Sequence, residues 1–276
     1  MELGERNCPI WDAHHHLVSE AGYADRLLRE MDRLGVARTG LIPIDPICPG
    51  MWVAHGAAVG PLGNADLAGI VRRHADRFWG YGFLRPGHCE PAEVDRLAEM
   101  GMTGLKFHLP LKPYGEPEHF EIYARAEQYG LPCLFHTGVF YPPGPMPGQG
   151  IRSENCRPIH LEPIAHEFPK LKIIAAHLGV CWTEEAATLC RLIPNIYADI
   201  SGSLSGWRSN KSMEWFRQTL YWPEAHKKMV FGSDVHVDEL EPALEAQRRI
   251  VEGIGWTAEQ CADFFCRNAE QLFGRG

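Results

Sequence analysis

The chain has 276 residues, of which 45% are hydrophobic and 22% are charged, and its formal net charge is −8. This charge argues against nucleic-acid binding, which needs a basic surface to neutralise phosphates. No apolar run approaches the ~20 residues that span a bilayer, and the N-terminus has no apolar signal-peptide core, so we expect a cytoplasmic protein without a membrane partner.

Short apolar runs alternate with amphipathic stretches along the chain. Runs typical of strands lie near residues 10–16, 40–45, 78–84, 104–109, 132–137, 172–177, 195–200 and 229–234. Helical spacing of apolar residues predicts helices within 22–35, 117–130 and 239–253. Residues 257–260 (TAEQ) fit a capping box that begins a last helix. Strand–helix alternation repeated this often predicts a parallel sheet, and eight such units close a barrel.

We therefore predict an α/β fold, a (β/α)8 TIM barrel that forms a single domain over residues 1–276. Length alone allows two domains, but barrels of about 250 residues commonly fold as one, and no linker divides the chain. An open doubly wound sheet is the alternative. It usually carries a glycine-rich phosphate loop, and the nearest candidate, residues 80–85, lacks the third glycine. The 9 cysteines include no CxxC pair, which argues against disulfides or a thiolate zinc site.

Histidines and aspartates follow the expected strands at their carboxyl ends. These residues are His14, His16, His108, His136, His177, Asp199 and Asp234. In a parallel barrel all such ends meet, so distant positions converge on one site. Residues two apart on a strand share a face, so His14 and His16 can point inward together. With His136 and Asp234 they would complete a shell of three imidazoles and one carboxylate, which suits zinc or a related divalent ion such as manganese.

A plainer interpretation exists for each histidine taken singly. A histidine after a strand is more often a hydrogen-bonded loop residue than a metal ligand. His15 takes the opposite face of its strand from His14, and we expect it to pack against the outer helices. Four further histidines fall in helical or loop contexts and are expected at the surface, namely His88, His119, His166 and His226.

The segment IWDAHHHL at residues 10–17 resembles the opening motif of the amidohydrolase superfamily, in its amidohydrolase-2 branch. Later motifs of that family are resembled, in the expected order, by residues 104–108, 134–138, 176–179 and 231–234. The resemblance covers nearly the whole chain and implies a (β/α)8 barrel with one divalent metal, usually zinc. It makes His14, His16, His136 and Asp234 the ligands. It makes His177 the histidine that polarises the substrate or transfers a proton.

Two departures from the family pattern lie at the predicted active end. Asp234 is followed by Val235-His236, where many relatives have an aromatic residue and then proline. Residues 177–179 are followed by Val180-Cys181-Trp182 rather than by a second glycine. We therefore expect a substrate that differs from those of familiar members.

The predicted chemistry depends on a metal-activated water. A bound zinc lowers the pKa of its water towards neutrality, His177 would orient that water or take its proton, and Asp234 would serve as ligand and proton shuttle. Lys106 has three interpretations: a carbamylated bridge between two metals, a partner for a substrate carboxylate, or a structural partner of Asp199. We favour the charge-binding role. His108, on the same face, would contact substrate or form a hydrogen bond behind the site.

Cationic and aromatic side chains near the strand ends indicate a small anionic, cyclic or aromatic organic substrate. The substrate-binding candidates are Lys106, His108, Arg85, Trp52, His55, Tyr141, Arg157 and Arg208. The arginines fit equally well as partners of acidic groups on the protein itself.

Three functions compete on this sequence. The first is metal-dependent hydrolysis of a small carboxylated lactone, amide or related C–O or C–N bond. The second is metal-dependent, non-oxidative decarboxylation of a small cyclic or aromatic acid at the same site, since the branch also contains decarboxylases. The third is a non-catalytic barrel whose metal is structural or lost. Self-association into a homo-oligomer stays open, because the sequence does not identify any helix face as an interface.

Overall fold

The computed structural model describes residues 9–50, 52–53, 58–140, 148 and 150–274. Eight parallel strands lie side by side in chain order, each hydrogen-bonded to the next. They are β1 (Ile10–Leu17), β2 (Val36–Pro43), β3 (Phe78–Leu84), β4 (Gly104–Phe107), β5 (Cys133–Phe135), β6 (Ile173–Ala175), β7 (Ile196–Asp199) and β8 (Met229–Val230). The backbone N–H of Ala13 donates to the carbonyl of Phe231 at 2.8 Å. This bond joins the end of β8 to β1, and the predicted TIM barrel is confirmed.

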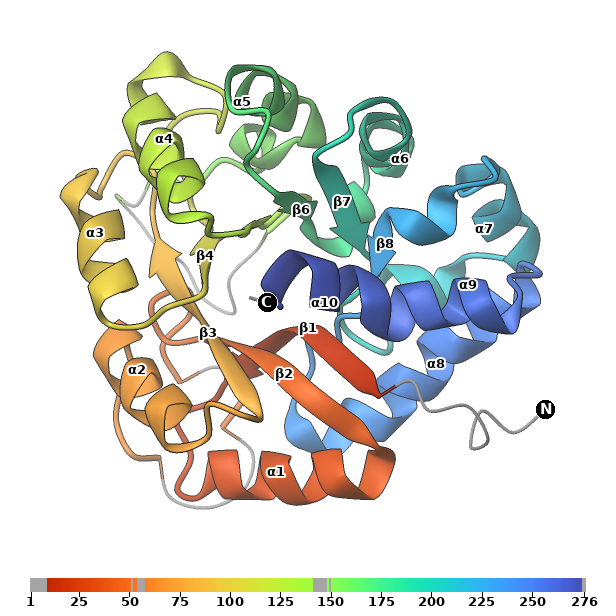
Figure 1. Cartoon of the computed structure of the whole chain (residues 1–276), viewed down its shortest axis with the longest axis horizontal. Coiled ribbons are helices and arrows are strands. Elements are labelled where there is room, and N and C mark those ends of the chain that lie inside the picture. The colour runs from red at the N-terminus through yellow and green to blue at the C-terminus, as the bar shows by residue number, and fades with distance from the viewer. Residues whose placement is uncertain (1–8, 51, 54–57, 141–147, 149, 275–276) are drawn as a thin grey trace.

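The helices surround the strands (Figure 1). They are α1 (Tyr23–Leu34), α2 (Asn64–Arg73), α3 (Ala92–Glu99), α4 (Phe120–Tyr129), α5 (Glu162–Glu167), α6 (Thr183–Leu192), α7 (Met213–Thr219), α8 (Leu240–Gly253), α9 (Ala258–Ala262) and α10 (Asn268–Phe273). Helix α1 shows why apolar spacing predicts a helix. Its buried face is formed by Tyr23, Leu27 and Met31, which are four residues apart. It ends at Gly35, whose φ of 71° is the left-handed conformation that glycine adopts without strain. The predicted capping box at Thr257 is confirmed at the start of α9.

Several strands end earlier than the sequence pattern predicts. The fifth and eighth strands were expected at 132–137 and 229–234, but β5 ends at Phe135 and β8 at Val230. The missing residues leave the ladder because the chain turns sharply into the barrel mouth. Leu109, His177 and Asp234 all have positive φ there (53°, 60° and 51°). The residues that follow the strands therefore build turns rather than strand ends.

The amino end of the barrel is closed by aromatic rings. Phe273 of α10 stacks on Trp79 of β3, with ring centroids 5.0 Å apart, and Trp79 lies 5.7 Å from Trp11 of β1. The Tyr81 ring meets Phe273 edge-on, and its hydroxyl donates to the carbonyl of Ala13 at 2.8 Å. In Figure 1, α10 crosses the middle of the strand ring. This helix seals one end, and the carboxyl ends of the strands lie at the other.

The remaining histidines follow the sequence expectation only in part. His15 is buried between Ser233 and Tyr23, at 2.8 and 3.0 Å, on the outer side of β1 as expected. His88 and His166 are exposed. The surface prediction is wrong for His119 and His226, which are buried. His226 Nδ1 forms a hydrogen bond of 2.7 Å with Asp263 Oδ2, a contact that the local sequence does not reveal.

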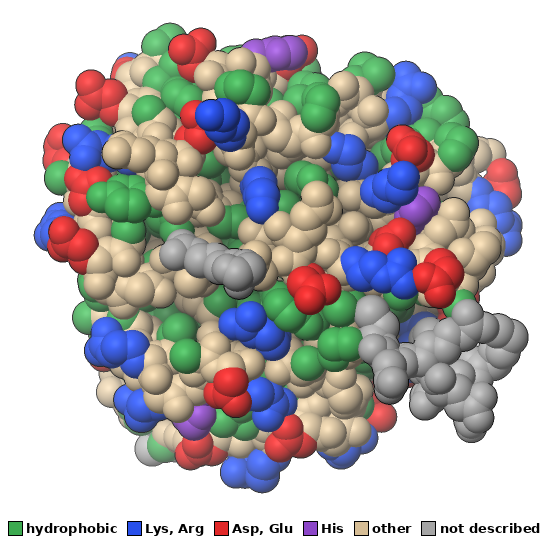
Figure 2. Space-filling view, in the orientation of Figure 1, with side chains coloured by type: hydrophobic (Ala, Val, Ile, Leu, Met, Phe, Trp, Pro, Cys, Tyr) green, Lys and Arg blue, Asp and Glu red, His purple; other side chains and the backbone are tan. Residues whose placement is uncertain are grey.

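The outer surface carries both signs of charge. On the face that shows α9 and α10, acidic and basic side chains are interspersed and do not form one broad basic area among the described residues (Figure 2). Within the described part of the chain, none of the helices combines the length and the apolar character that a membrane span requires.

Candidate metal centre

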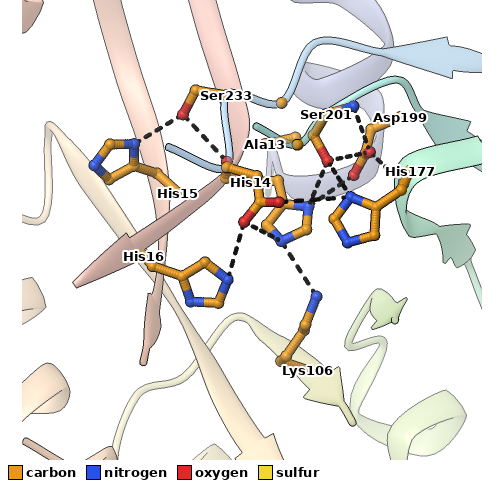
Figure 3. Close-up of polar contacts among 12 residues, drawn as sticks. Ala13, His14, His15, His16, Lys106, His177, Asp199, Ser201 and Ser233 are labelled. Atoms are coloured by element: carbon orange, nitrogen blue, oxygen red, sulfur yellow. Dashed lines mark hydrogen bonds and ion pairs between the residues drawn. The ribbon is translucent and has the colours of Figure 1, made fainter. Parts of the chain in front are cut away.

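Three residues from distant parts of the chain bring ligand atoms together at the carboxyl end of the barrel. His14 of β1, His177 after β6 and Asp234 after β8 each offer one such atom, and all lie within 4.8 Å of one another. His16 joins them, since its Nε2 lies 3.3 Å from Asp234 Oδ1. Figure 3 shows His14 and His16 on the same strand, with His177 reaching them from a different segment of the chain. The predicted convergence of His14, His16 and Asp234 is present.

The turn that delivers Asp234 is built for close approach to β1. The backbone N–H of Asp234 donates to the carbonyl of His14 at 2.7 Å. A Cβ at Gly232 would lie 2.7 Å from the Cβ of His14, so only glycine allows this approach. Ser233 is tied to Asp12 through its N–H (2.9 Å) and its hydroxyl (2.6 Å). Together these bonds hold Asp234 in its positive-φ conformation, which costs a non-glycine residue on the order of 1 kcal/mol.

His136 lies beside this group rather than inside it. Its ring stacks on His108 with centroids 3.9 Å apart, and its centroid is 5.1 Å from that of His177. The Nε2 of His136 is buried and has no hydrogen-bond partner within the described structure. A buried polar atom without a partner is costly, and an imidazole nitrogen left in this state fits a metal ligand. Imidazoles with one carboxylate match the donors that zinc and manganese take, so the residues present fit a divalent ion.

Asp199 orients the ligands from behind. Its Oδ2 lies 2.9 Å from Nδ1 of His14, which donates to it and keeps the lone pair of Nε2 on the side of Asp234. A carboxylate behind a histidine is the usual arrangement at metal sites, because it fixes the tautomer and the ring direction. Asp199 Oδ1 also accepts the backbone N–H groups of His177 (2.7 Å) and Ser201 (3.0 Å).

The roles of Asp12, Ser201 and Ser233 are not assigned by the sequence. The position of Asp12 in the opening motif does indicate a role near the site, because Asp12 lies on the same strand face as His14. The two serines carry no such signal, because a serine after a strand is common.

Burial sets the charge state of the histidines. It lowers the pKa of His16 and that of His177 to about 4, and it holds the pKa of His136 well below its usual value. For Asp234, burial acts to raise the pKa, but the neighbouring His14 and the hydrogen bond from His16 hold it well below the usual range. At neutral pH His16, His136 and His177 are therefore neutral and Asp234 is ionised, the forms that bind a divalent metal.

Lys106 brings a cationic group to the same place. Its side chain is buried at 1% exposure, and Nζ lies 3.2 Å from Nε2 of His14 (Figure 3). Burial lowers the pKa of Lys106 to about 8. Within the described structure its hydrogen bond is to His14 rather than to Asp199, which places the ammonium beside the predicted metal ligands. Its contact with a substrate anion stays a prediction.

The other predicted substrate-binding residues differ in the contacts that they make with the rest of the protein. Trp52 meets the ring of His16 edge-on, with centroids 5.6 Å apart. Arg85 donates from Nε to the carbonyl of Leu109 at 2.8 Å. His55 and Tyr141 lie outside the described residues.

Two arginines are held by protein groups. Arg157 pairs with Glu185 at 2.8 Å and with Glu154 at 3.3 Å. Arg208 is 5% exposed and donates to the carbonyls of Ile200 (2.7 Å) and Gly202 (2.8 Å). Arg157 thus has acidic partners on the protein, the alternative that the sequence left open, whereas the partners of Arg208 are backbone carbonyls.

Comparison with known proteins adds a family and a set of structural neighbours. The family model Amidohydro_2, described as amidohydrolase, matches residues 11–275. No curated protein matches the sequence. The structure is similar to an uncharacterized TIM-barrel protein from Bordetella bronchiseptica (TM-score 0.71, 16% identity, covering 97% of this chain and 100% of that one).

Two further neighbours are named as decarboxylases. One is 5-carboxyvanillate decarboxylase from Sphingomonas paucimobilis (TM-score 0.62, 16% identity, 98% of this chain and 100% of that one). The other is 5-carboxyvanillate decarboxylase from Novosphingobium aromaticivorans, complexed with manganese and 4-hydroxy-3-methoxy-5-nitrobenzoic acid (TM-score 0.63, 16% identity, 100% of both chains). At this level of identity the likeness shows the fold.

Proposed function

The chain belongs to the amidohydrolase family, and on that premise we propose that it is a metal-dependent hydrolase of a small carboxylated lactone, amide or related C–O or C–N bond. The observation that carries the proposal is the convergence of His14 Nε2 and His16 Nε2 on Asp234 Oδ1, at 3.7 and 3.3 Å, with His177 beside them. His14, His16, His136 and Asp234 would hold one divalent ion, zinc in the first place and manganese in the second. Such an ion supplies Lewis acidity, which polarises a carbonyl and acidifies water.

The side chains around the ligands have complementary tasks in this reaction. His177, neutral because burial lowers its pKa to about 4, accepts the proton of the attacking water. Asp234 receives that proton in turn and passes it to the leaving group. The Lys106 ammonium binds the carboxylate of the substrate and neutralises charge that develops nearby.

His108 is a hydrogen-bond donor to substrate oxygen. Its Nδ1 accepts the backbone N–H of Leu109 at 2.7 Å. Burial holds the pKa of His108 well below its usual value, so the ring is neutral and its single proton is on Nε2. A small anionic substrate therefore meets two donors from the end of β4, the Lys106 ammonium and the His108 Nε2–H.

Decarboxylation of a cyclic or aromatic acid is the second candidate, and the named activity of two structural neighbours supports it. That reaction needs a residue that gives a proton to carbon after carbon dioxide leaves. The lowered pKa values of His177 and Asp234 leave both groups unprotonated at neutral pH. An unprotonated group can take a proton from water, as hydrolysis requires, but has none to give to carbon until it has first gained one.

The two reactions are separated by isotope labelling. Protein stripped by chelation and reloaded with zinc or manganese is offered carboxylated lactones, carboxylated amides and hydroxybenzoic acids in ¹⁸O-water. Hydrolysis places one ¹⁸O in the product carboxylate, as read by mass spectrometry, and we expect this result. Release of carbon dioxide from an aromatic acid, with no label in the organic product, would instead establish the decarboxylase.

The matched control replaces a histidine that lies far from the site. His166→Ala removes an imidazole from the exposed face of α5 and leaves turnover unchanged. His14→Ala abolishes turnover with either metal. A protein that binds neither ion in stoichiometric amount, as measured by elemental analysis, contradicts both candidate reactions.

A further inference from the structure

The hydroxyl of Ser201 lies at a junction of polar groups just beyond β7. Its Oγ is 2.5 Å from Asp199 Oδ1, 2.9 Å from His177 Nδ1 and 3.2 Å from His14 Nδ1 (Figure 3). The residue is 0% exposed, so these protein groups are what its hydroxyl meets. Neither metal binding nor substrate binding, as described above, gives this serine a task.

The protons at this junction can be counted. Asp199 accepts two backbone N–H groups, the Ser201 hydroxyl and Nδ1 of His14, so it is a carboxylate that only accepts. The single hydroxyl proton of Ser201 is therefore donated to Asp199, and the serine oxygen is left with lone pairs alone. A hydrogen bond between this oxygen and His177 Nδ1 then requires the proton to be on Nδ1. In a neutral ring the lone pair is consequently on Nε2.

We propose that Ser201 is a positioning residue that fixes His177 in the Nδ1–H tautomer, so that Nε2 is the nitrogen that takes the proton of the attacking water. The inference rests on the proposed role of His177 in hydrolysis and deepens it by naming the reacting atom. It also assigns Nδ1 of His177 to the serine rather than to a metal.

The backbone around Ser201 is braced to hold this geometry. Arg208 donates to the carbonyls on either side of the serine, those of Ile200 and Gly202, and Trp207 Nε1 donates to the carbonyl of Ser201 itself at 3.1 Å. Three consecutive carbonyls are thus held by two side chains. The buried guanidinium of Arg208 therefore fixes the backbone on both sides of Ser201, and with it the position of the Ser201 hydroxyl.

The partner ring is held just as firmly. His177 has a φ of 60°, and its N–H donates to the same Asp199 oxygen that accepts from Ser201. The carboxylate therefore controls the backbone of His177 directly and its ring through the serine. Strained backbone at a chemically active side chain, kept in place by several bonds, is the pattern expected of a pre-organised group.

The experiment reads the tautomer directly by NMR. Protein labelled with ¹⁵N-histidine is loaded with zinc, which is diamagnetic, and the ring nitrogens are assigned by comparison with the His177→Asn variant. A metal-free sample is recorded beside it. We expect the protonated-nitrogen signal of His177 at Nδ1 and the lone-pair signal at Nε2. Ser201→Ala removes the acceptor, and we expect the Nδ1–H preference of His177 to be lost while zinc stoichiometry is retained.

The matched control is Ser205→Ala, on the same loop, where an exposed hydroxyl has Ser203 as its one hydrogen-bond partner within the described part of the chain. It leaves the His177 signals unchanged. Turnover on the hydrolysed substrate falls ~10–100-fold in Ser201→Ala, the usual effect of losing a group that orients a residue at a metal site. An Nε2–H tautomer in the wild-type protein, or signals that do not change in Ser201→Ala, overturns the proposal. The NMR result stands whether or not hydrolysis proves to be the reaction, so the two proposals fail separately.

Discussion

The amino end of the barrel is packed with aromatic rings, whereas the carboxyl end of the same strands is lined with imidazoles and a carboxylate. Strand β1 contributes to both: Trp11 near its start lies in the aromatic cluster, and His14 and His16 near its end lie in the polar one. The apolar end buries surface and stabilises the fold at about 25 cal/mol per Å². The polar end buries ionisable groups, which is costly unless each finds a partner.

The difference between the two ends predicts that they fail in different ways. A substitution in the aromatic cluster should lower the free energy of unfolding and leave the site chemistry alone. A substitution at the polar end should remove metal or turnover with a smaller effect on folding. This separation is expected in a TIM barrel, where the carboxyl ends of the strands carry the active site and the amino ends contribute to stability.

The largest expected effect is the loss of metal. His14→Ala and Asp234→Asn each remove a ligand from the group of atoms within 4.8 Å, and we expect both variants to lose bound metal and activity together. Elemental analysis of the purified proteins after incubation with zinc measures this directly. Stoichiometric metal in both variants would show that the site is elsewhere.

The matching experiment at the other end is Phe273→Ala. The Phe273 ring is 6% exposed and stacks on Trp79, so its removal leaves a cavity. We expect the free energy of unfolding in urea to fall by about 3–5 kcal/mol, with metal stoichiometry unchanged. Tyr221→Ala, which removes a ring that is 63% exposed, is the control and changes stability by about 0.5 kcal/mol or less. Loss of metal in Phe273→Ala would show that the two ends are coupled.

A third substitution sharpens the comparison within the polar end. His177→Asn keeps a polar side chain at the position but removes the imidazole that we propose as the proton acceptor. We expect metal to stay bound and turnover to fall by ~10²-fold or more, the scale of lost acid–base assistance. An unchanged rate constant at saturating substrate would remove His177 from the chemistry.

Much of this organisation could be predicted from sequence because strand ends are positions that a pattern reveals. Alternation of apolar runs predicted the barrel, and the period of two placed His14 and His16 on one face. The positions of turn residues could not be predicted in this way. Whether Ser201 and Ser233 meet a histidine depends on backbone angles after β7 and β8, which no local pattern sets.

The arginines show the same limit from the opposite direction. Arg157 and Arg208 were candidates because cations near strand ends fit an anionic substrate. In the fold, Arg157 has Glu185 as partner, and Arg208 has two carbonyls of the β7 loop. Residue type alone indicates what a side chain can bind, but only the three-dimensional structure shows which group reaches it first.

The smallest predicted effect concerns two cations that differ in burial. Lys106→Met removes a buried ammonium while keeping an unbranched side chain of similar length, and we expect KM for a carboxylated substrate to rise about 10-fold, since a hydrogen bond to a charged group contributes roughly 1.5–3 kcal/mol. Arg157→Gln is the contrast, because its guanidinium is part of a partly exposed ion pair with Glu185. An exposed pair contributes under about 1 kcal/mol to stability, and we expect KM to stay as in the wild type. Steady-state kinetics on both variants, with metal content measured in parallel, test which cation binds the substrate carboxylate. A KM that rises in Arg157→Gln and not in Lys106→Met would place the anion-binding position at the rim of the barrel rather than in its interior.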